Sequence, residues 1–410
     1  MTTALLLTGP TAGNVHPTLP IVGELTRRGH RVMHLTTSEF AEATVAFGAS
    51  VLSYESAAAS LDPTEVFAFD DPMLPHLLLL KENLQVQKAA EAALDEEPPD
   101  VIIYEDTQSF AGKLLAHRWN RPTVRITVGF ATNDKYSWYQ DFADASGIPG
   151  PHTLESFRVE MASVLRTRRV EPDLEEFWHG VADQDEEFWA GIADQNLVLI
   201  PRSFQFEGDT FDDRFLFVGP ALEGRGDRWT PPDDRPVLLV SLGTNFNNHP
   251  EWFRTCVQAF ADTRWHVVMT VGSRIDPSEL GPLPDNIEAH SFLSHFAVLE
   301  HARICVTHGG IGTVMQSLYW GTPMVTVPHY AFDVQPMARR IVELGLGRRI
   351  LADQFDAATW RDTVEELAGD ADALARVQEM QRDIREAGGA ARAVDAILAQ
   401  VDGAANNSPT

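Results

Sequence analysis

Short apolar runs alternate with segments of helical periodicity along the chain. Residues 5–7 form an apolar run, apolar positions recur at helical spacing over 19–28, and a second apolar run starts at 32–35. This pattern predicts a strand, a helix and a parallel strand. Further strands are predicted at 101–104, 124–127, 237–241, 266–271, 304–307 and 324–327, further helices at 110–118, 251–260 and 312–320, and only helices after residue 327.

The alternation is interrupted at 219–236. This stretch, GPALEGRGDRWTPPDDRP, is rich in Pro, Gly and charged residues, which predicts a linker. The alternation on both sides predicts an α/β protein of two facing parallel-sheet domains, at 1–218 and 237–385. A C-terminal helix and tail at 386–410 are a candidate to pack back on the first domain. Because open parallel sheets bind ligands beyond the carboxyl ends of their strands, we expect the site in the cleft between the domains.

The segment 130–195 is acidic and contains a near-duplication, EEFWHGVADQ followed eleven residues later by EEFWAGIADQ. Eleven residues are close to three helical turns, so Trp178 and Trp189 share a face if one helix runs through both. The favoured interpretation is a tandem duplication that keeps a surface helix amphipathic. The alternative is an aromatic wall for a large apolar ligand.

Charge narrows the choice of partners. The chain has 410 residues, 44% of them apolar, and its 32 Lys and Arg against 59 Asp and Glu give a formal net charge of −27. Such a surface repels phosphate backbones and anionic lipids, so we expect neither nucleic-acid nor membrane binding. With two cysteines, no CxxC pair and no basic N-terminal region, the sequence indicates a protein of the reducing cytoplasm without a zinc site.

The sharpest local motif is CVTHGGIGTVMQSL at 305–318. A strand ends at Thr307, and the glycines after His308 open a helix whose N-terminus presents free N–H groups and a positive dipole. A diphosphate is the natural occupant, and His308 and Thr313 can add hydrogen bonds to it. The spacing is neither a Walker motif nor GxGxxG, which disfavours ATP and NAD. The structural alternative is a tight strand–helix turn that only needs glycine.

Several segments together carry a family resemblance. They are LLLTGPTAGNVHPTLPIVGELTRRGHRV at the start, LLVSLGTNFNNHPEWFR after the linker, WHVVMTVGS and DPSELGPLPDNIEAHSF before the HGG motif, and IREAGGAARAVDAI near the end. Over essentially its full length the chain resembles the nucleotide-sugar glycosyltransferases with two Rossmann-like domains, in particular the antibiotic-tailoring branch that acts on macrolides and enediynes of the calicheamicin type. The resemblance implies an inverting, metal-independent enzyme of the glycosyltransferase B fold.

The resemblance also assigns the donor site to the C-terminal domain. Phe292 stands where the family usually has a Trp that stacks on the nucleotide base, and the backbone of Leu293 would read the base edge. Two loops match the diphosphate-binding positions, with Ser241 and Thr244 in one and His308, Gly309, Gly310, Gly312 and Thr313 in the other.

Sugar hydroxyls are held in this family by an acidic residue followed by Gln, which corresponds here to Asp333 and Gln335. One residue separates the pair, and an insertion follows Pro328. Either Val334 or Gln335 could therefore face the sugar.

The catalytic base departs from the family pattern. The first strand is usually followed by Gly-His-x-x-Pro, in which the His deprotonates the acceptor, but residues 13–17 read GNVHP and the base position holds Asn14. The carboxylate that orients this His corresponds to Glu105, with Asp106 next to it. Because Asn cannot accept a proton near neutral pH, another group must take that role.

Three routes are open. In the first, His16 enters the site and pairs with Glu105 or Asp106, giving an imidazole base. In the second, one of these carboxylates is the base, with its pKa raised by burial. In the third, the acceptor is a phenol, amine or hydroxylamine that needs no strong base, and Asn14 only positions it. The first and third routes are favoured equally over the second. The structural alternative for His16 is that it is only a polar residue at the start of a helix.

Acceptor contacts are predicted in the N-terminal domain, from Phe130, Tyr136 and Trp138 and from parts of 67–80. The predicted function is transfer of a sugar, favouring a deoxysugar, from a TDP- or UDP-sugar to a hydrophobic natural product. No cofactor is expected beyond this co-substrate, and a second copy of the chain is a candidate partner. The alternatives are a catalytically silent nucleotide-sugar binder or auxiliary partner, and a sugar-nucleotide epimerase or hydrolase of the same fold.

Overall fold

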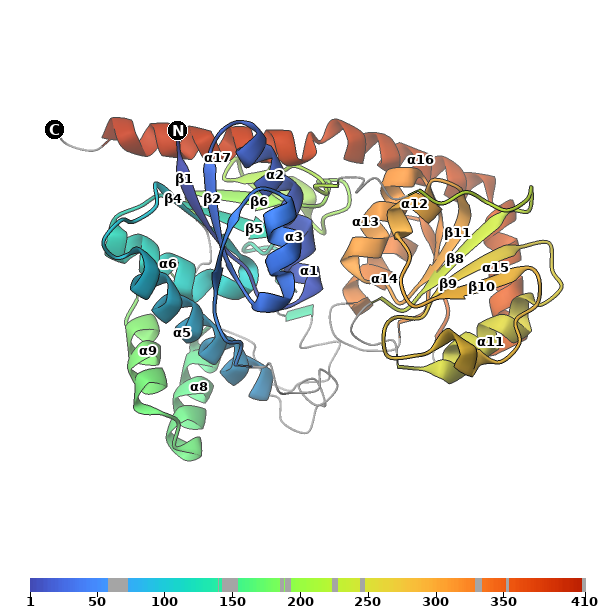
Figure 1. Cartoon of the computed structure of the whole chain (residues 1–410), viewed down its shortest axis with the longest axis horizontal. Coiled ribbons are helices and arrows are strands. Elements are labelled where there is room, and N and C mark those ends of the chain that lie inside the picture. The colour runs from blue at the N-terminus through green and yellow to red at the C-terminus, as the bar shows by residue number, and fades with distance from the viewer. Residues whose placement is uncertain are drawn as a thin grey trace. The chain divides into compact units, whose positions relative to one another are not determined.

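The computed structural model describes residues 1–57, 73–138, 140–141, 154–184, 188, 193–222, 228–243, 248–328, 334–351 and 354–407 (Figure 1). The chain forms two compact units. Unit 1 comprises Met1–Leu222 together with Ala387–Thr410, and unit 2 comprises Glu223–Glu386.

Unit 1 is built on a parallel sheet of seven strands in the order β3-β2-β1-β4-β5-β6-β7. The strands are β1 Thr3–Leu7, β2 Arg31–Thr36, β3 Ser50–Ser53, β4 Val101–Glu105, β5 Thr123–Thr127, β6 Gln195–Val198 and β7 Phe215–Phe217. Since β1 pairs with both β2 and β4, the strand order reverses between β1 and β4. Residues just beyond these two strands therefore lie where open α/β sheets bind ligands.

The helices of unit 1 are α1 Ala12–Val15, η1 His16–Thr18, α2 Leu19–Arg27, η2 Ser38–Phe40, α3 Ala41–Ala46, α5 Leu74–Leu94, η3 Asp106–Gln108, α6 Ser109–Trp119, α8 Leu154–Arg168, α9 Pro172–Ala182, η4 Gly208–Thr210 and α17 Gly389–Asn407. Among them, α2 and α6 correspond to the predicted segments 19–28 and 110–118. Helix α17 buries Ala393, Val394 and Ile397 in the core that α2 and the sheet share. The C-terminal segment is thus part of unit 1.

One helix does not run through the duplicated tryptophan motif. Helix α9 ends at Ala182, where the N–H of Asp183 closes the last turn, so the condition for a common face of the two tryptophans, one helix through both motifs, is not met. Trp178 is 3% exposed in a core cluster with residues of α5 and α8. Trp189 lies outside the described residues.

Unit 2 is built on a parallel sheet of six strands in the order β10-β9-β8-β11-β12-β13. The strands are β8 Val237–Ser241, β9 His266–Thr270, β10 Ile287–His290, β11 Ala302–Thr307, β12 Met324–Thr326 and β13 Gly347–Arg349. The strand order reverses between β8 and β11, whose last residues, Ser241 and Thr307, are direct partners in the register. The predicted α/β fold with two parallel-sheet domains is confirmed.

Strand β13 corrects the expectation that only helices follow residue 327. This strand has three residues, lies at the edge of the sheet and pairs with β12. Both of its Arg residues are half-buried, so its sequence, GRR, needs no apolar run. Periodicity does not reveal such a strand.

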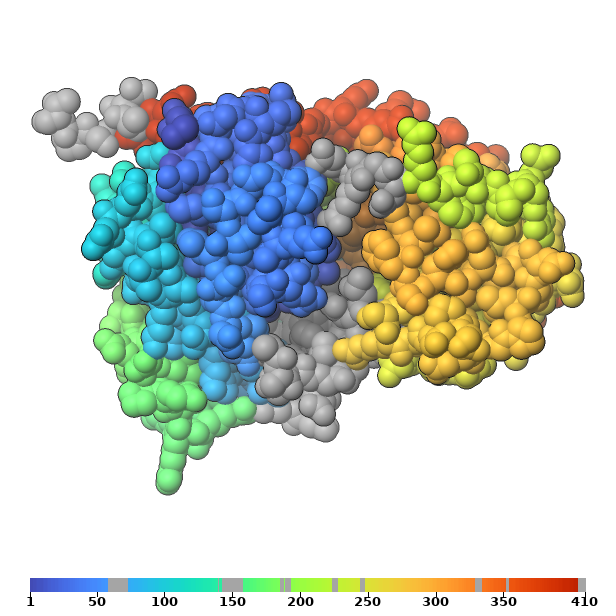
Figure 2. Space-filling view, viewed as in Figure 1, coloured from blue at the N-terminus to red at the C-terminus, as the bar shows by residue number. Residues whose placement is uncertain are grey.

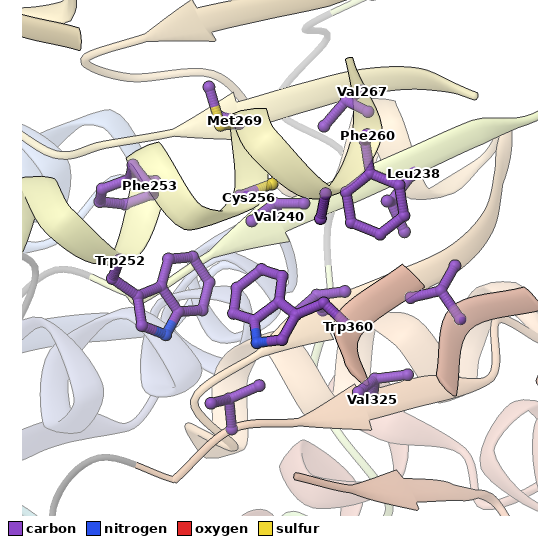
Figure 3. Packing of buried hydrophobic residues seen from close by; sticks show 14 of the residues in the cluster. Leu238, Val240, Trp252, Phe253, Cys256, Phe260, Val267, Met269, Val325 and Trp360 are labelled. Atoms are coloured by element: carbon purple, nitrogen blue, oxygen red, sulfur yellow. The ribbon is translucent and has the colours of Figure 1, made fainter. Parts of the chain in front are cut away.

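The helices of unit 2 are α11 Pro250–Phe260, η5 Pro277–Leu280, α12 His295–Leu299, α13 Ile311–Trp320, α14 Val334–Glu343, α15 Ala357–Gly369 and α16 Ala371–Glu386. Trp252 of α11 and Trp360 of α15 meet edge to face in the core, with ring centroids 4.6 Å apart (Figure 3). This contact joins two helices that are far apart in the sequence, over the strands β8 and β9.

Residues 228–236, from the stretch predicted as a linker, lie on the surface of unit 2 and are yellow-green in Figure 2. The ring of Trp229 stacks on that of His266 at 6.1 Å and donates a hydrogen bond of 3.1 Å to Glu288. These contacts fix the path of the chain as it enters unit 2.

Candidate active site

Glu105 ends β4 and lies buried at the point where the strand order of unit 1 reverses. Its carboxylate accepts hydrogen bonds from the Thr107 hydroxyl at 2.6 Å and the Thr107 N–H at 3.2 Å, and another from the side chain of Asn14. Burial, aided by the negative charge of Asp106, raises the pKa of Glu105 to about 7, although the hydrogen bonds favour the charged form.

Asn14 lies in the short helix α1, directly after the loop that follows β1. Its amide oxygen accepts a hydrogen bond from the Thr11 hydroxyl, which leaves its N–H₂ group to donate to Glu105. A Cβ atom at Gly9 would lie only 2.5 Å from the Thr107 hydroxyl and 3.2 Å from the Asn14 amide oxygen. Glycine at position 9 therefore lets the loop approach β4 closely, and the structure brings Asn14 and Glu105 together.

The other two catalytic candidates have different surroundings. Asp106 accepts hydrogen bonds from Arg125 Nε at 2.6 Å and from the Thr127 hydroxyl at 3.0 Å, so its charge is already paired. His16 is exposed in η1, with its ring edge-on to Phe40 at 5.9 Å. The structure thus places Asn14, and not His16, against the buried carboxylate of Glu105.

In unit 2, the ring of His308 lies between two glycines from different loops. A Cβ atom at Gly243, after β8, would lie 2.5 Å from His308 Cε1, and one at Gly310 would lie 2.5 Å from Nε2. Gly243 and Gly309 have φ angles of +77° and +101°, which side chains rarely adopt. The absence of side chains at Gly243 and Gly310 therefore leaves the space that the His308 ring occupies.

The ends of β8 and β11 hold these two loops. Ser241 Oγ accepts a hydrogen bond of 3.1 Å from the N–H of Gly243, and Thr307 Oγ1 accepts one of 3.2 Å from the N–H of Gly309. Both hydroxyl residues are buried. Ser241 accordingly fixes its loop, while Thr244 lies outside the described residues.

Helix α13 begins at this point with Gly310 as its N-cap, and among the described residues no side chain caps its first N–H groups. A Cβ atom at Gly312 would meet nothing within 4 Å, so the first turn borders open space. A ten-residue helix with free N–H groups beside His308 is suited to bind an anion.

His295 is a site residue that the sequence did not reveal. Its Nε2 lies 2.8 Å from the Thr270 hydroxyl at the end of β9, and its Nδ1 lies 3.4 Å from the hydroxyl of Thr313 in α13. Burial lowers the pKa of His295 to about 4, so the ring is neutral and one nitrogen donates while the other accepts. The ring therefore orients the hydroxyl of Thr313.

Two further donor candidates differ in exposure. Phe292 lies in the loop after β10 with 78% of its surface exposed, although it is a large apolar side chain, and Leu293 beside it is half-buried. In α14, Val334 is 4% exposed, while Gln335 is half-buried and accepts a hydrogen bond from Arg349. Of the two residues considered for the sugar, Gln335 is the accessible one. Asp333 lies outside the described residues.

Two of the three predicted acceptor residues belong to an aromatic cluster of unit 1. Phe130 stacks on Phe204 at 5.7 Å and Tyr136 on Phe206 at 5.1 Å, and both predicted residues are less than 10% exposed. Trp138 is half-buried, and its backbone N–H donates to Thr132 Oγ1 at 3.2 Å. Trp138 is thus the most accessible of the three.

Comparison with known proteins identifies the family. Residues 254–396 match the family described as "Erythromycin biosynthesis protein CIII-like, C-terminal domain". The chain is 35% identical over 399 residues to the NDP-glycosyltransferase YjiC of Bacillus licheniformis, with 95% of each chain covered. It is 33% identical over 400 residues to the demethyllactenocin mycarosyltransferase of Streptomyces fradiae, covering 95% of this chain and 84% of that one.

The chain belongs to the antibiotic-tailoring glycosyltransferases. This glycosyltransferase is also similar to the crystal structure of CalG4, the calicheamicin glycosyltransferase, with 43% identity, a TM-score of 0.84 and full coverage of both chains. The resemblance predicted from the sequence and the glycosyltransferase B fold are confirmed. In the part of the chain that the structure describes, no helix is long and apolar enough to cross a membrane.

Proposed function

We propose that this glycosyltransferase moves a sugar from a TDP- or UDP-sugar to a hydrophobic natural product, with inversion at the anomeric carbon and without a metal. The observation that carries the donor side is the His308 ring held between Gly243 and Gly310 beside the uncapped N-terminus of α13. A relative named as a mycarosyltransferase of demethyllactenocin supports a natural-product acceptor.

The donor side stabilises the leaving group. As the bond between the anomeric carbon and the phosphate oxygen breaks, negative charge develops on the nucleoside diphosphate. The free N–H groups at the start of α13 and a hydrogen bond from His308 oppose this charge, and the helix dipole adds to them. In a chain with a net charge of −27, such local donors are needed to hold an anion.

The acceptor side orients the nucleophile. Asn14, held by Glu105 and by the Thr11 hydroxyl, occupies the position of the family base and cannot take a proton. This arrangement supports an acceptor that is acidic or already nucleophilic, which Asn14 positions. The route through His16 as the base is the competing proposal, and the Asn14 and His16 variants in the Discussion separate the two.

The activity is tested by incubating the protein with TDP- and UDP-sugars and a panel of alcohol, phenol, amine and hydroxylamine acceptors. Mass spectrometry of a new glycoside, and NMR of its anomeric configuration, would establish transfer with inversion. Undiminished turnover with a chelator present would support metal independence.

Other outcomes identify the rival functions. Consumption of the donor without an acceptor would indicate an epimerase or hydrolase. Binding of a sugar nucleotide without turnover on any acceptor would indicate a silent partner. A cytoplasmic location, a homodimer, and the lack of nucleic-acid and membrane binding stay predictions.

A further inference from the structure

Arg349, at the end of the edge strand β13, is a partly buried cation that pairs with no acidic side chain of the described residues. In the described part of the chain no carboxylate pairs with it, and its Nε is buried without a hydrogen-bond partner. Burial accordingly lowers the pKa of Arg349 from its ordinary value, and no anion among the described residues offsets this effect. The chain has nearly twice as many acidic as basic residues, so an arginine that pairs with no carboxylate of the described residues is unexpected.

The preceding residue shows the contrast. Arg348 donates to Asp370 at 2.5 Å and lies 3.6 Å from Glu366, so its guanidinium is paired with carboxylates. Side chains alternate between the two faces of a strand, and Arg349 therefore points to the opposite face from Arg348. On that side its Nη2 donates to the side-chain oxygen of Gln335 in α14.

This bond fixes the orientation of the Gln335 amide. Its oxygen accepts from Arg349, so the N–H₂ end is the donor side of the amide. A flipped amide would set two donors against each other. The guanidinium is always charged and donates in a rigid plane, which makes it a firm holder of a carboxamide.

Gln335 lies close to the HGG turn. The carbonyl oxygen of Val334, its neighbour in α14, is 3.4 Å from the Cβ position of Gly309, directly after His308. The start of α14 is thus packed against the loop proposed to hold the diphosphate. Its other side lies along β13, which carries Arg349.

We propose that Arg349 is a positioning residue for the donor sugar: it holds Gln335 so that the amide N–H₂ group reads a sugar hydroxyl oxygen. This inference rests on the proposed function of the donor site. It differs from a phosphate-binding role for Arg349, because it predicts an effect on the sugar and none on the diphosphate.

The test compares Arg349→Met with its matched control, Arg348→Met. Calorimetric titration gives the affinities for TDP-glucose and TDP, or for UDP-glucose and UDP if the wild type prefers uracil. We expect Arg349→Met to weaken binding of the sugar nucleotide about 3- to 10-fold, the effect of one neutral hydrogen bond, with the free diphosphate unchanged within about twofold. Arg348→Met should leave both affinities unchanged.

A double-variant cycle tests the route through Gln335. Gln335→Leu alone should reproduce the loss, and adding Arg349→Met to it should cause no further loss, because both act through one contact. Arg349→Lys, which keeps a donor, should recover part of the affinity. With the 3-deoxy and 4-deoxy analogues of the donor sugar, the wild type should discriminate against one of them, and both single variants should lose that preference.

Three results would overturn the inference. A parallel loss of affinity for the free diphosphate would make Arg349 a phosphate ligand. Additive losses in the double variant would show that it acts independently of Gln335, and unchanged affinities would show that Gln335 does not need it. If Arg349→Met does not fold, Gln335→Leu and Arg349→Lys carry the same test. A wild type that binds no sugar nucleotide would instead refute the proposed function.

Discussion

Asn14 donates a hydrogen bond to the buried carboxylate of Glu105, although Asn14 lies after β1 and Glu105 is the last residue of β4. In the related glycosyltransferases a histidine is expected at the first position and a carboxylate at the second. By this family pattern, an amide stands in this protein where a proton acceptor is expected. The role of the carboxylate shifts from orienting a base to orienting a residue that can only donate and accept hydrogen bonds.

Glu105→Gln tests this buried charge through the pH dependence of stability. The pKa of Glu105 is raised from 4.5 to about 7 in the folded protein, so the folded state holds its proton more tightly than the unfolded state. The stabilisation by this group is complete below about pH 4.5 and is lost as pH rises through 7. Unfolding free energies from denaturant titrations should fall less between pH 5 and 7 in Glu105→Gln than in the wild type.

The difference between the two proteins is the relevant quantity. Buried His34 and His295 have lowered pKa values, to about 3 and about 4, and add the opposite slope to both proteins. A difference that does not change with pH would show that Glu105 titrates as an ordinary carboxyl.

His308→Ala tests the proposed phosphate loop. Loss of one hydrogen bond to a charged group costs about 1.5–3 kcal/mol, which corresponds to roughly 10- to 150-fold in affinity for the nucleoside diphosphate. The rate of transfer should fall with it. Titration calorimetry with TDP and UDP measures the effect, and His117→Ala, on the exposed surface of α6, serves as the control. Unchanged affinity would remove His308 from the donor site.

Gly310→Ala and Gly312→Ala form a matched pair in the same turn. A methyl group at position 310 would meet the His308 ring at 2.5 Å, whereas one at position 312 would meet nothing within 4 Å. We expect Gly310→Ala to lower the unfolding free energy by about 1–3 kcal/mol through overpacking and to weaken diphosphate binding.

Gly312→Ala should preserve stability and weaken binding only, because the ligand would need the space that the methyl group takes. Thermal unfolding with and without TDP separates the two effects. Full binding by Gly312→Ala would place the diphosphate away from this turn.

Local signals in the sequence were sufficient for the central strands of both sheets and for the HGG loop, but not for β3, β6, β7, β10 and β13. Strand ends such as Ser241 and Thr307 follow apolar runs, and the glycines around His308 mark a turn that is recognisable without its neighbours. The position of Asn14 opposite Glu105 followed from the family resemblance. Each of these features depends on a few adjacent residues or on a motif that the family shares.

Features that depend on tertiary contacts were missed. His295 gains its role from Thr270 and Thr313, which lie on other elements, and a lone histidine in the sequence carries no such signal. The contact between Arg349 and Gln335 requires β13, an edge strand too short and too charged to be predicted. The condition that one helix runs through both tryptophan motifs is not met, because the backbone ends α9 at Ala182, a turn that the eleven-residue spacing does not reveal.

Variants of His16 and Asn14 test which group replaces the histidine base of the family. If His16 abstracts the proton, His16→Ala should slow transfer about 10²- to 10⁴-fold, the usual contribution of general base catalysis. We expect a rate close to that of the wild type, because Asn14 is the side chain that contacts Glu105.

Asn14→His should instead restore a base oriented by a buried carboxylate and should raise transfer to weakly acidic alcohols at least about 10-fold. Transfer to phenols and hydroxylamines should change little, since these acceptors supply their own nucleophile. Rates measured from pH 6 to 9 should then follow the acceptor's pKa in the wild type and that of the imidazole in Asn14→His. A large loss in His16→Ala, recovered by adding Asn14→His, would establish His16 as the base and refute the proposed role of the acceptor.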